Sequence, residues 1–183
     1  MQYCRDYDDD YLGQQITKLY ADIYSSAELI CHVDSDCVFH QDVTPEALAP
    51  GGRPTVYTRA RQELPRHWPW TAPTTNFLGW TPELDFMQYP PFTFPRWLYA
   101  DVRQFCERTK GCTLEQWIQA QPARGFSEFN VMGAFAYRYH PEKFEWVDVA
   151  KMRPEAKYCH WFWSWERVSP ATRRTVLRDI ATA

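Results

Sequence analysis

The stretch ELICHVDSDCVFHQDV, residues 28–43, places Asp34 and Asp36 directly after a run of apolar residues. Aspartate is uncommon within strands, and carboxylates are rarely buried unless they are paired or bound to a metal. We expect a strand over residues 28–33 that ends at this acidic pair. If the chain turns there, both side chains converge on one point at the edge of a sheet, as the ligands of a divalent cation do.

Three interpretations of the acidic pair are open. In the first, Asp34 and Asp36 form a DxD motif that holds Mn²⁺ or Mg²⁺ against a nucleotide diphosphate, because hard cations prefer carboxylate oxygens and also bind phosphates. In the second, Asp34 is the nucleophile of a haloacid-dehalogenase-type phosphotransferase. That fold opens with the motif strand and needs a later acidic pair, whereas here a helix comes first. In the third, the aspartates cap a turn. We favour the first.

Length and composition limit the class of protein. The 183 residues suit a single domain spanning 1–183, and a net charge of −3 gives no electrostatic reason to expect nucleic acid as a partner. No apolar run reaches the roughly 20 residues that span a bilayer, and the amino terminus lacks the profile of a signal peptide. The six cysteines show no zinc-binding spacing, so we interpret them as reduced thiols. A cytoplasmic location is expected.

The pattern around the motif predicts an α/β fold. Residues 8–25 have the apolar periodicity of an amphipathic helix, with aspartates in the first turn where they favour the helix dipole. A helix followed by a buried strand is half of a βαβ unit. We therefore expect a mixed, mainly parallel sheet flanked by helices, with Asp34 and Asp36 outside the carboxyl end of a strand, where such sheets bind ligands.

Residues 65–95 form a segment rich in prolines and aromatic rings. Its seven prolines make a helix unexpected, and it is longer than an ordinary connection. The chain carries nine Trp, eleven Tyr and eleven Phe, more rings than a core usually needs, and sugars bind rings by stacking. We expect residues 65–97, which include this segment, to form the acceptor side of a site, with Trp80, Phe92 and Arg96 as substrate-binding residues. The alternative is a rigid wrap over the sheet.

Further elements follow in the second half of the chain. The pattern predicts helices over residues 95–111, 113–122 and 125–141, a strand over 144–149, a strand or an irregular aromatic run over 157–165, and a helix over 169–183. Pro95 lies near the start of the first helix and Gly111 at its end, while Thr113 and Gln116 have the spacing of a capping box. Ser127 is the expected cap of the third helix.

Together these elements resemble GT-A fold glycosyltransferases. The helix YLGQQITKLYAD, the strand ELICHVDSDCVF and the later GFSEFNVMGAFAY are similar, over about residues 10–165, to a small group that contains the amino-terminal domain of a chlorovirus (large algal virus) glycosyltransferase. The resemblance implies that Asp34 contacts ribose or metal and that Asp36 ligates the metal directly. GT-A domains usually open with a strand and loop that hold uracil and ribose. The pattern here begins instead with the helix before the acidic pair, so the amino-terminal part of the fold is expected to be short.

Sugar transfer also needs a base that takes the proton of the acceptor hydroxyl. Glu128 is our candidate, because GFSEFN places a single carboxylate among aromatic residues, where burial raises its pKa toward the working range. The alternative is an acid that only favours the first helical turn. Asp85 and Asp101 are the other candidates.

Two more residues are candidates for the site. His160 could complete the metal shell, or it could be a packed histidine among tryptophans. Asn130 could bind sugar hydroxyls, or it could cap locally. The expected function is an inverting, Mn²⁺- or Mg²⁺-dependent transfer of a hexosyl or deoxyhexosyl group from a UDP-type nucleotide sugar to a glycan or other hydroxyl, in the host cytoplasm if the chain is viral. The rival interpretation is a non-catalytic glycan-binding module whose acids bind calcium.

Overall fold

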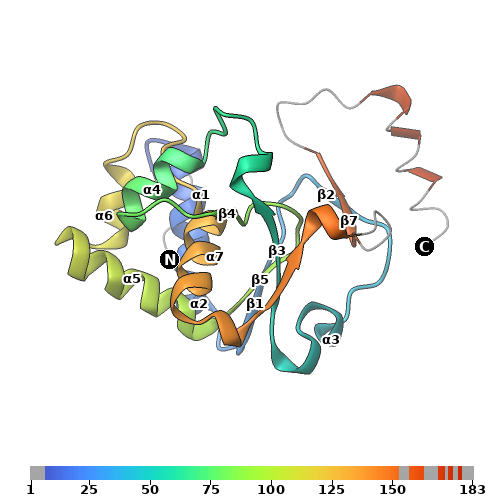
Figure 1. The fold of residues 1–183 in the computed structure, drawn as a ribbon, viewed down its shortest axis with the longest axis horizontal. Coiled ribbons are helices and arrows are strands. Elements are labelled where there is room, and N and C mark those ends of the chain that lie inside the picture. Colours follow the sequence, from blue (N-terminus) through green and yellow to red (C-terminus); the bar gives the residue numbers. More distant parts are fainter. Residues whose placement is uncertain (1–6, 153–156, 163–168, 172, 175–176, 179–183) are drawn as a thin grey trace.

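The computed structural model describes residues 7–152, 157–162, 169–171, 173–174 and 177–178 (Figure 1). Its helices are α1 (Asp10–Leu19), α2 (Ala21–Tyr24), α3 (Pro45–Leu48), α4 (Thr71–Leu78), α5 (Arg96–Lys110), α6 (Leu114–Gln119) and α7 (Glu128–Tyr139). Its strands are β1 (Leu29–His32), β2 (Cys37–Phe39), β3 (Thr55–Ala60), β4 (Leu84–Asp85), β5 (Phe92–Pro95), β6 (Glu145–Asp148) and β7 (Cys159–Trp161).

Local signals account for the ends of the main helices. The Asp9 side chain caps α1 by accepting a hydrogen bond from the backbone N–H of Leu12 at 3.0 Å. The α5 helix ends at Gly111, whose φ of 70° lies in the left-handed region that glycine adopts without strain. The capping box of α6 between Thr113 and Gln116 is present with both of its hydrogen bonds. The predicted end of α5 at Gly111 and the predicted capping box are confirmed, whereas the single helix predicted over residues 8–25 is divided at Tyr20 into α1 and α2.

The strands form short sheets that are mostly antiparallel. The β1 strand pairs antiparallel with β5, with Ile30 opposite Phe94, and β2 pairs antiparallel with β7. In the third sheet, of order β4-β3-β6, β3 is antiparallel to β4 and parallel to β6. The mixed α/β class is confirmed, but the expectation of a mainly parallel sheet is wrong for the described strands. Parallel pairing there is confined to β3 and β6, because β1 and β2 both find antiparallel partners from later in the chain.

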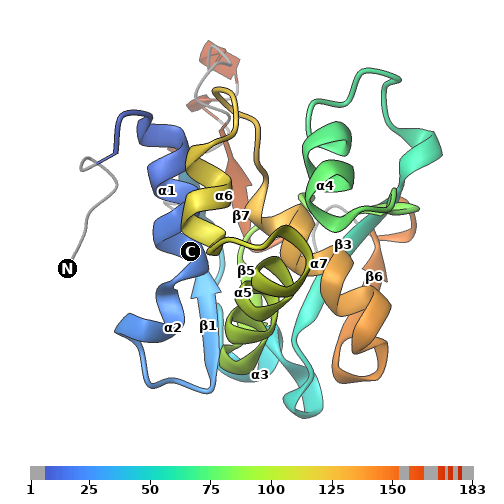
Figure 2. The same ribbon diagram turned by 90° about the vertical axis from the view of Figure 1, so that its left-hand side faces the viewer.

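Helices gather on one side of these strands. In Figure 1, α1, α4, α5, α6 and α7 lie on one side, while β2, β7 and α3 lie on the other. Figure 2 shows α1 beside α6, and the arrow of β1 pointing towards α1. The residues that follow β1 therefore arrive next to α1. This arrangement brings the acidic pair close to α1, which precedes it in the sequence with only α2 and β1 between them.

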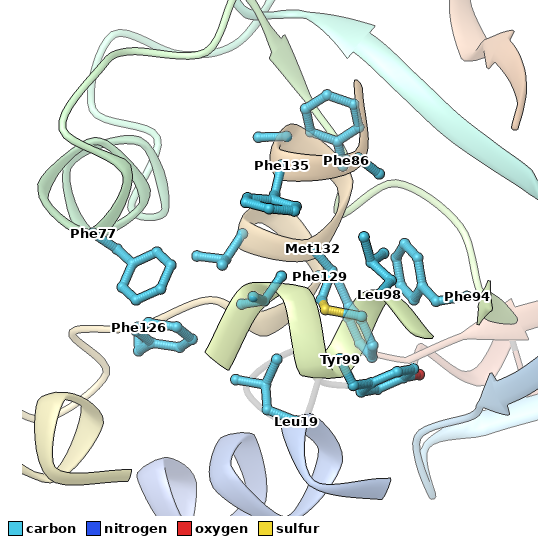
Figure 3. Close-up of a cluster of buried hydrophobic side chains, with 14 of the residues drawn as sticks. Leu19, Phe77, Phe86, Phe94, Leu98, Tyr99, Phe126, Phe129, Met132 and Phe135 are labelled. Atoms are coloured by element: carbon cyan, nitrogen blue, oxygen red, sulfur yellow. The ribbon is translucent and has the colours of Figure 1, made fainter. Parts of the chain in front are cut away.

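The core is built on α5 and α7 and is rich in aromatic rings (Figure 3). Phe129 of α7 stacks on Phe92 of β5 with ring centroids 3.8 Å apart. Helix α7 also packs tightly against the segment after β4, because a Cβ added at Gly133 would lie 2.4 Å from the Cβ of Phe86. Much of the aromatic content therefore serves packing.

The proline-rich segment 65–95 contains regular structure. Residues Thr71–Leu78 form α4, so the expectation that no helix forms there is wrong. Pro73 lies in the first turn of this helix. Backbone N–H groups in the first turn have no acceptor within the helix, so the N–H that proline lacks costs no helical hydrogen bond there. Gly79 ends the helix with a φ of 78°. The segment is an ordered connection with a helix in it.

The remaining predicted elements agree in part. The strands predicted over 144–149 and 157–165 appear as β6 and β7, and residues 163–165 lie outside the described residues. In the predicted final helix, residues 170–171, 173–174 and 177–178 are helical, and the others from 172 onward lie outside the described residues. Among the described residues, no helix combines the length and the apolar character needed to cross a membrane.

Candidate functional site

A pocket opens beside the acidic pair, between α1, the turn after β1 and the start of α7. Its cavity volume is about 190 Å³, which is smaller than the roughly 300–1,000 Å³ of typical ligand sites, so a larger ligand would extend beyond it. Charged residues at the pocket are Lys18, Asp34, Asp36, Arg124 and Glu128. The other lining residues are Tyr11, Gln14, Gln15, Ser35, Trp70, Met87 and Trp161. The pocket thus combines three carboxylates, two cations and three rings.

Lys18 of α1 joins two of the carboxylates. Its Nζ lies 2.6 Å from Oδ1 of Asp34 and 2.7 Å from Oε1 of Glu128, and its side chain is only 13% exposed. The same ammonium lies 4.7 Å from the centroid of the Phe129 ring. Both carboxylates raise the pKa of Lys18 against the opposing effect of burial. Lys18 is therefore a fixed positive charge within the site.

Glu128 is buried at the inner end of the pocket. Its side chain is 2% exposed, its backbone N–H donates to Oε1 of Gln15 at 2.9 Å, and Oε1 receives Lys18. The second carboxylate oxygen, Oε2, is buried and has no hydrogen-bond partner. Burial raises the pKa of this carboxyl, and Lys18 opposes that rise. A buried carboxylate oxygen without a partner is costly, which makes Glu128 a candidate for accepting a proton or a hydrogen bond.

Asp36 faces the same pocket from the other side of the turn. Its Oδ1 accepts a hydrogen bond from the indole Nε1–H of Trp161 at 3.0 Å. Burial and the negative charge of Asp34 both raise the pKa of the Asp36 carboxyl. Asp34 and Asp36 both line the pocket, on either side of Ser35. The strand pair β2–β7 positions both Asp36 and Trp161.

Aromatic rings form the outer wall. Tyr11 of α1 stacks on Trp70 with ring centroids 5.9 Å apart and planes 7° apart. The Arg124 guanidinium lies 5.7 Å from the centre of the Tyr11 ring, and its backbone has a φ of 59°. The backbone of Arg124 is thus held in a region that non-glycine residues rarely adopt. A guanidinium in the wall of the pocket suits an anionic group of a ligand.

The acidic pair could hold part of a cation site. Asp34 and Asp36 give hard oxygen ligands, but no group of three or more His, Cys, Asp or Glu able to hold a metal occurs among the described residues. Mg²⁺ and Mn²⁺ sites that work on phosphates often use one or two carboxylates and take their other ligands from substrate and water. The donor set fits that kind of shared site, and it does not fit a site made of protein ligands alone.

His160, the predicted third ligand, lies elsewhere. It stands opposite Val38 in the β2–β7 pair, next to Trp161, whose side chain lines the pocket. Successive side chains of a strand point to opposite faces. The His160 ring lies 4.8 Å from the ring of His40 and 6.2 Å from that of Phe162, centroid to centroid. The structure therefore does not bring His160 to the pocket with Asp34 and Asp36.

The predicted substrate-binding residues are spread over the fold. Phe92 is a core residue under Phe129. The Oδ1 of Asn130 accepts from the backbone N–H of Phe86 at 2.8 Å, and its Nδ2 donates to Ser127 Oγ at 3.2 Å. Ser127 precedes α7 as predicted but makes no capping hydrogen bond with its side chain. These contacts use the polar atoms of Asn130 within the protein.

Trp80 and Arg96 also lie outside the pocket lining. Trp80 has a buried indole Nε1–H with no partner, and the Arg138 guanidinium lies 4.7 Å from its ring centre. Arg96 is exposed at the start of α5. Of the other candidate bases, Asp101 is on α5 with its Oδ2 3.5 Å from His140 Nε2, and Asp85 is buried away from the pocket. The site is thus made by Asp34, Asp36 and Glu128 from the predicted set.

Sequence reasoning missed the contribution of α1. Tyr11, Gln15 and Lys18 follow one another at four and three residues, so they form a stripe along one side of the helix beside its apolar face. That spacing was a usable signal for a helix that lines a site. Trp70, Arg124 and Trp161 come from three separate segments, and no local pattern marks them.

Comparisons with other proteins place the chain in a family. Residues 7–163 match the model of a family of unknown function, DUF6492. No curated protein and no solved structure matches the sequence. The family match includes every residue of the pocket. The chain therefore belongs to the DUF6492 family.

Proposed function

We propose that this protein is a metal-dependent glycosyltransferase with a GT-A-like site, which moves a sugar from a nucleotide diphosphate to a hydroxyl of an acceptor. The observation that carries the proposal is the convergence of Asp34, Asp36 and Glu128 on one pocket. A sugar-binding module needs rings and hydrogen-bond donors, but it has no use for a buried carboxylate with an unpartnered oxygen.

Asp34 and Asp36 are the residues that would hold Mn²⁺ or Mg²⁺. When bound, the cation neutralises the negative charge that develops on the leaving diphosphate. Asp36 is held towards the pocket by Trp161, and Asp34 is held by Lys18. Arg124 adds a positive charge at the outer wall, where it suits the phosphates or another anionic part of the donor.

Glu128 supplies the base. Its Oε2 accepts the proton of the acceptor hydroxyl while the acceptor oxygen forms a bond to the anomeric carbon. The bond from that carbon to the diphosphate oxygen breaks at the same time, and the diphosphate leaves with the electron pair. Attack from the side opposite the leaving group inverts the configuration. The buried Trp70 stacks on Tyr11 and fixes the orientation of that ring in the pocket wall.

The decisive experiment removes Asp36. The Asp36→Ala variant should lose the rise in Tm that Mn²⁺ with UDP gives the wild-type protein, because the proposed direct ligand is gone and bound ligands stabilise only the folded state. Asp34→Ala should weaken the effect. The matched control is Asp148→Ala, since Asp148 is an acid on β6 that is not a lining residue of the pocket. An undiminished Mn²⁺/UDP effect in Asp36→Ala, measured by thermal shift and calorimetry, would refute the acidic pair as the metal site.

A further inference from the structure

Lys18 is shared between two carboxylates that have no direct bond to each other. Its ammonium is 2.6 Å from Asp34 and 2.7 Å from Glu128, so a single positive charge serves both acids. Among the described residues, no hydrogen bond or ion pair links Glu128 directly to Asp34 or Asp36. Any influence of Glu128 on the acidic pair must therefore pass through Lys18 or through space.

The balance of charge at the inner end of the pocket is incomplete. Asp34, Asp36 and Glu128 carry three negative charges when ionised, against one positive charge on Lys18 and one on Arg124, so the pocket keeps a net negative charge. A divalent cation would offset it. Lys18 already holds Oδ1 of Asp34, so a cation bound to Asp34 would compete with Lys18 for the charge of the same carboxylate.

On the basis of the proposed function, we propose that Lys18 is a positioning residue. Because Lys18 is shared between Asp34 and Glu128, Glu128 influences the affinity of Asp34 and Asp36 for a divalent cation without contacting the cation. When Asp34 takes up the cation, Lys18 is left to Glu128 alone. The undivided charge of Lys18 then keeps the buried carboxylate of Glu128 ionised and fixed in place. Occupation of the acidic pair and readiness of the base are coupled in this way.

The coupling predicts effects of opposite sign at two neighbouring residues. Without Lys18, Asp34 loses its competitor and the site loses a repelling positive charge, so cation affinity should rise. Without the charge of Glu128, Lys18 interacts with Asp34 alone, so the affinity of the acidic pair for the cation should fall. A lysine that only supports the fold would give weaker binding in its absence, because the carboxylates would lose their fixed positions.

The test measures Mn²⁺ binding by electron paramagnetic resonance, with Mn²⁺ alone and with Mn²⁺ plus UDP. Lys18→Met should bind Mn²⁺ about tenfold more tightly than the wild type, the size of one partly screened charge contact. Glu128→Gln should bind it about threefold more weakly, because only the shared fraction of the Lys18 charge is redirected. Lys18→Arg, which keeps the charge, should stay near the wild-type affinity.

Arg103→Met is the matched control. Arg103 forms a buried ion pair with Asp22 at 2.6 Å and also bonds the carbonyl of Leu19 at 2.9 Å, next to Lys18 on the same helix. Its loss should lower Tm and leave Mn²⁺ affinity unchanged. If Lys18→Met does not fold, the double variant Lys18→Met/Glu128→Gln removes both buried charges together, and it should also bind Mn²⁺ more tightly than the wild type.

The outcomes separate the two proposals. If the wild type binds Mn²⁺ and Lys18→Met, or the double variant in its place, binds it equally or more weakly, the sharing of Lys18 is refuted and the metal site stands. If the wild type binds no Mn²⁺ with or without UDP, the proposed function fails and the coupling fails with it. Opposite shifts in Lys18→Met and Glu128→Gln support the coupling.

Discussion

Glu128 and Asp85 are two buried carboxyl groups in different regions of the molecule, and their surroundings differ in kind. Glu128 begins α7 at the pocket, has Lys18 on one oxygen and has no partner on the other. Asp85 ends β4, and neutral donors occupy both of its oxygens. Trp68 donates to Oδ2 at 2.8 Å, while the backbone N–H of Met87, at 3.1 Å, and the side-chain amide of Gln88 donate to Oδ1. Burial is the largest cause of a raised pKa in both groups.

The difference separates a structural acid from a reactive one. A carboxylate whose oxygens are all occupied fixes the segments that contact it, and Asp85 ties together the segments that bring Trp70 and Met87 to the pocket. A carboxylate with a free oxygen beside a cavity can still accept a proton from a ligand. Sequence reasoning had placed both acids among the candidate bases, and only their partners distinguish them.

The largest effect expected from this comparison is on turnover in Glu128→Gln. Glutamine keeps the shape of the side chain but cannot accept a proton, so transfer should slow by about 10²-fold or more. The measurement is the rate of sugar transfer from a nucleotide sugar in the presence of Mn²⁺. A variant that transfers sugar at close to the normal rate would remove Glu128 from the chemistry.

Asp85→Ala should affect stability instead. It leaves the Trp68 and Met87 donors without their acceptor, which costs about 1–3 kcal/mol of the free energy of unfolding. Urea denaturation measures this loss, and transfer assayed well below Tm should stay within a few-fold of wild type. A normal stability combined with a large loss of rate would reverse the roles assigned to the two acids.

The same variant has a pH signature. Because the folded protein raises the pKa of Asp85, the folded state holds its proton more tightly than the unfolded state. Its contribution to stability is fully present below the ordinary carboxyl pKa of about 4 and is lost as pH rises through the raised value. The stability of the wild type relative to Asp85→Ala should therefore decrease with rising pH across that window. A pH-independent difference would contradict the raised pKa.

The smallest effect concerns Trp161, which supports Asp36 from a distant strand. Trp161→Phe keeps an aromatic ring in the pocket wall but removes the Nε1–H that donates to Asp36 at 3.0 Å. One hydrogen bond to a charged group contributes about 1.5–3 kcal/mol when buried and less where water competes, so we expect a loss of Mn²⁺/UDP affinity of about three- to tenfold. Calorimetry measures this change. An unchanged affinity would mean that Asp36 keeps its position without the indole.

The sequence was sufficient for elements whose signals are local. Gly111 and the Thr113–Gln116 capping box marked helix ends because each acts on its own turn, and the strand before Asp34 followed from a continuous apolar run. Strand pairing was not accessible in this way. Nothing within residues 29–32 specifies that β1 pairs antiparallel with β5, since that choice depends on packing against α5 and α7.

The residues of the site also divide into those that the sequence could identify and those that it could not. Asp34, Asp36 and Glu128 could be selected because acids in apolar surroundings are unusual wherever they occur. His160 and Asn130 could be proposed by residue type, but strand alternation and the backbone N–H of Phe86 decide where their side chains are used. Lys18 was overlooked because a lysine on an amphipathic helix normally faces water, and only the tertiary fold brings it to the buried Glu128 and the half-buried Asp34.

The pairing of β2 with β7 sets an order of events during synthesis. Trp161, which holds Asp36, lies 125 residues further along the chain. At the ribosome's rate of about 5–20 residues per second, roughly ten seconds pass between the emergence of the acid and the arrival of its partner. A nascent chain can assemble α1, β1 and the Lys18–Asp34 contact well before β7 exists. The acidic pair therefore acquires its final geometry late, and a chain released before β7 would carry Asp36 without the support that aims it at the pocket.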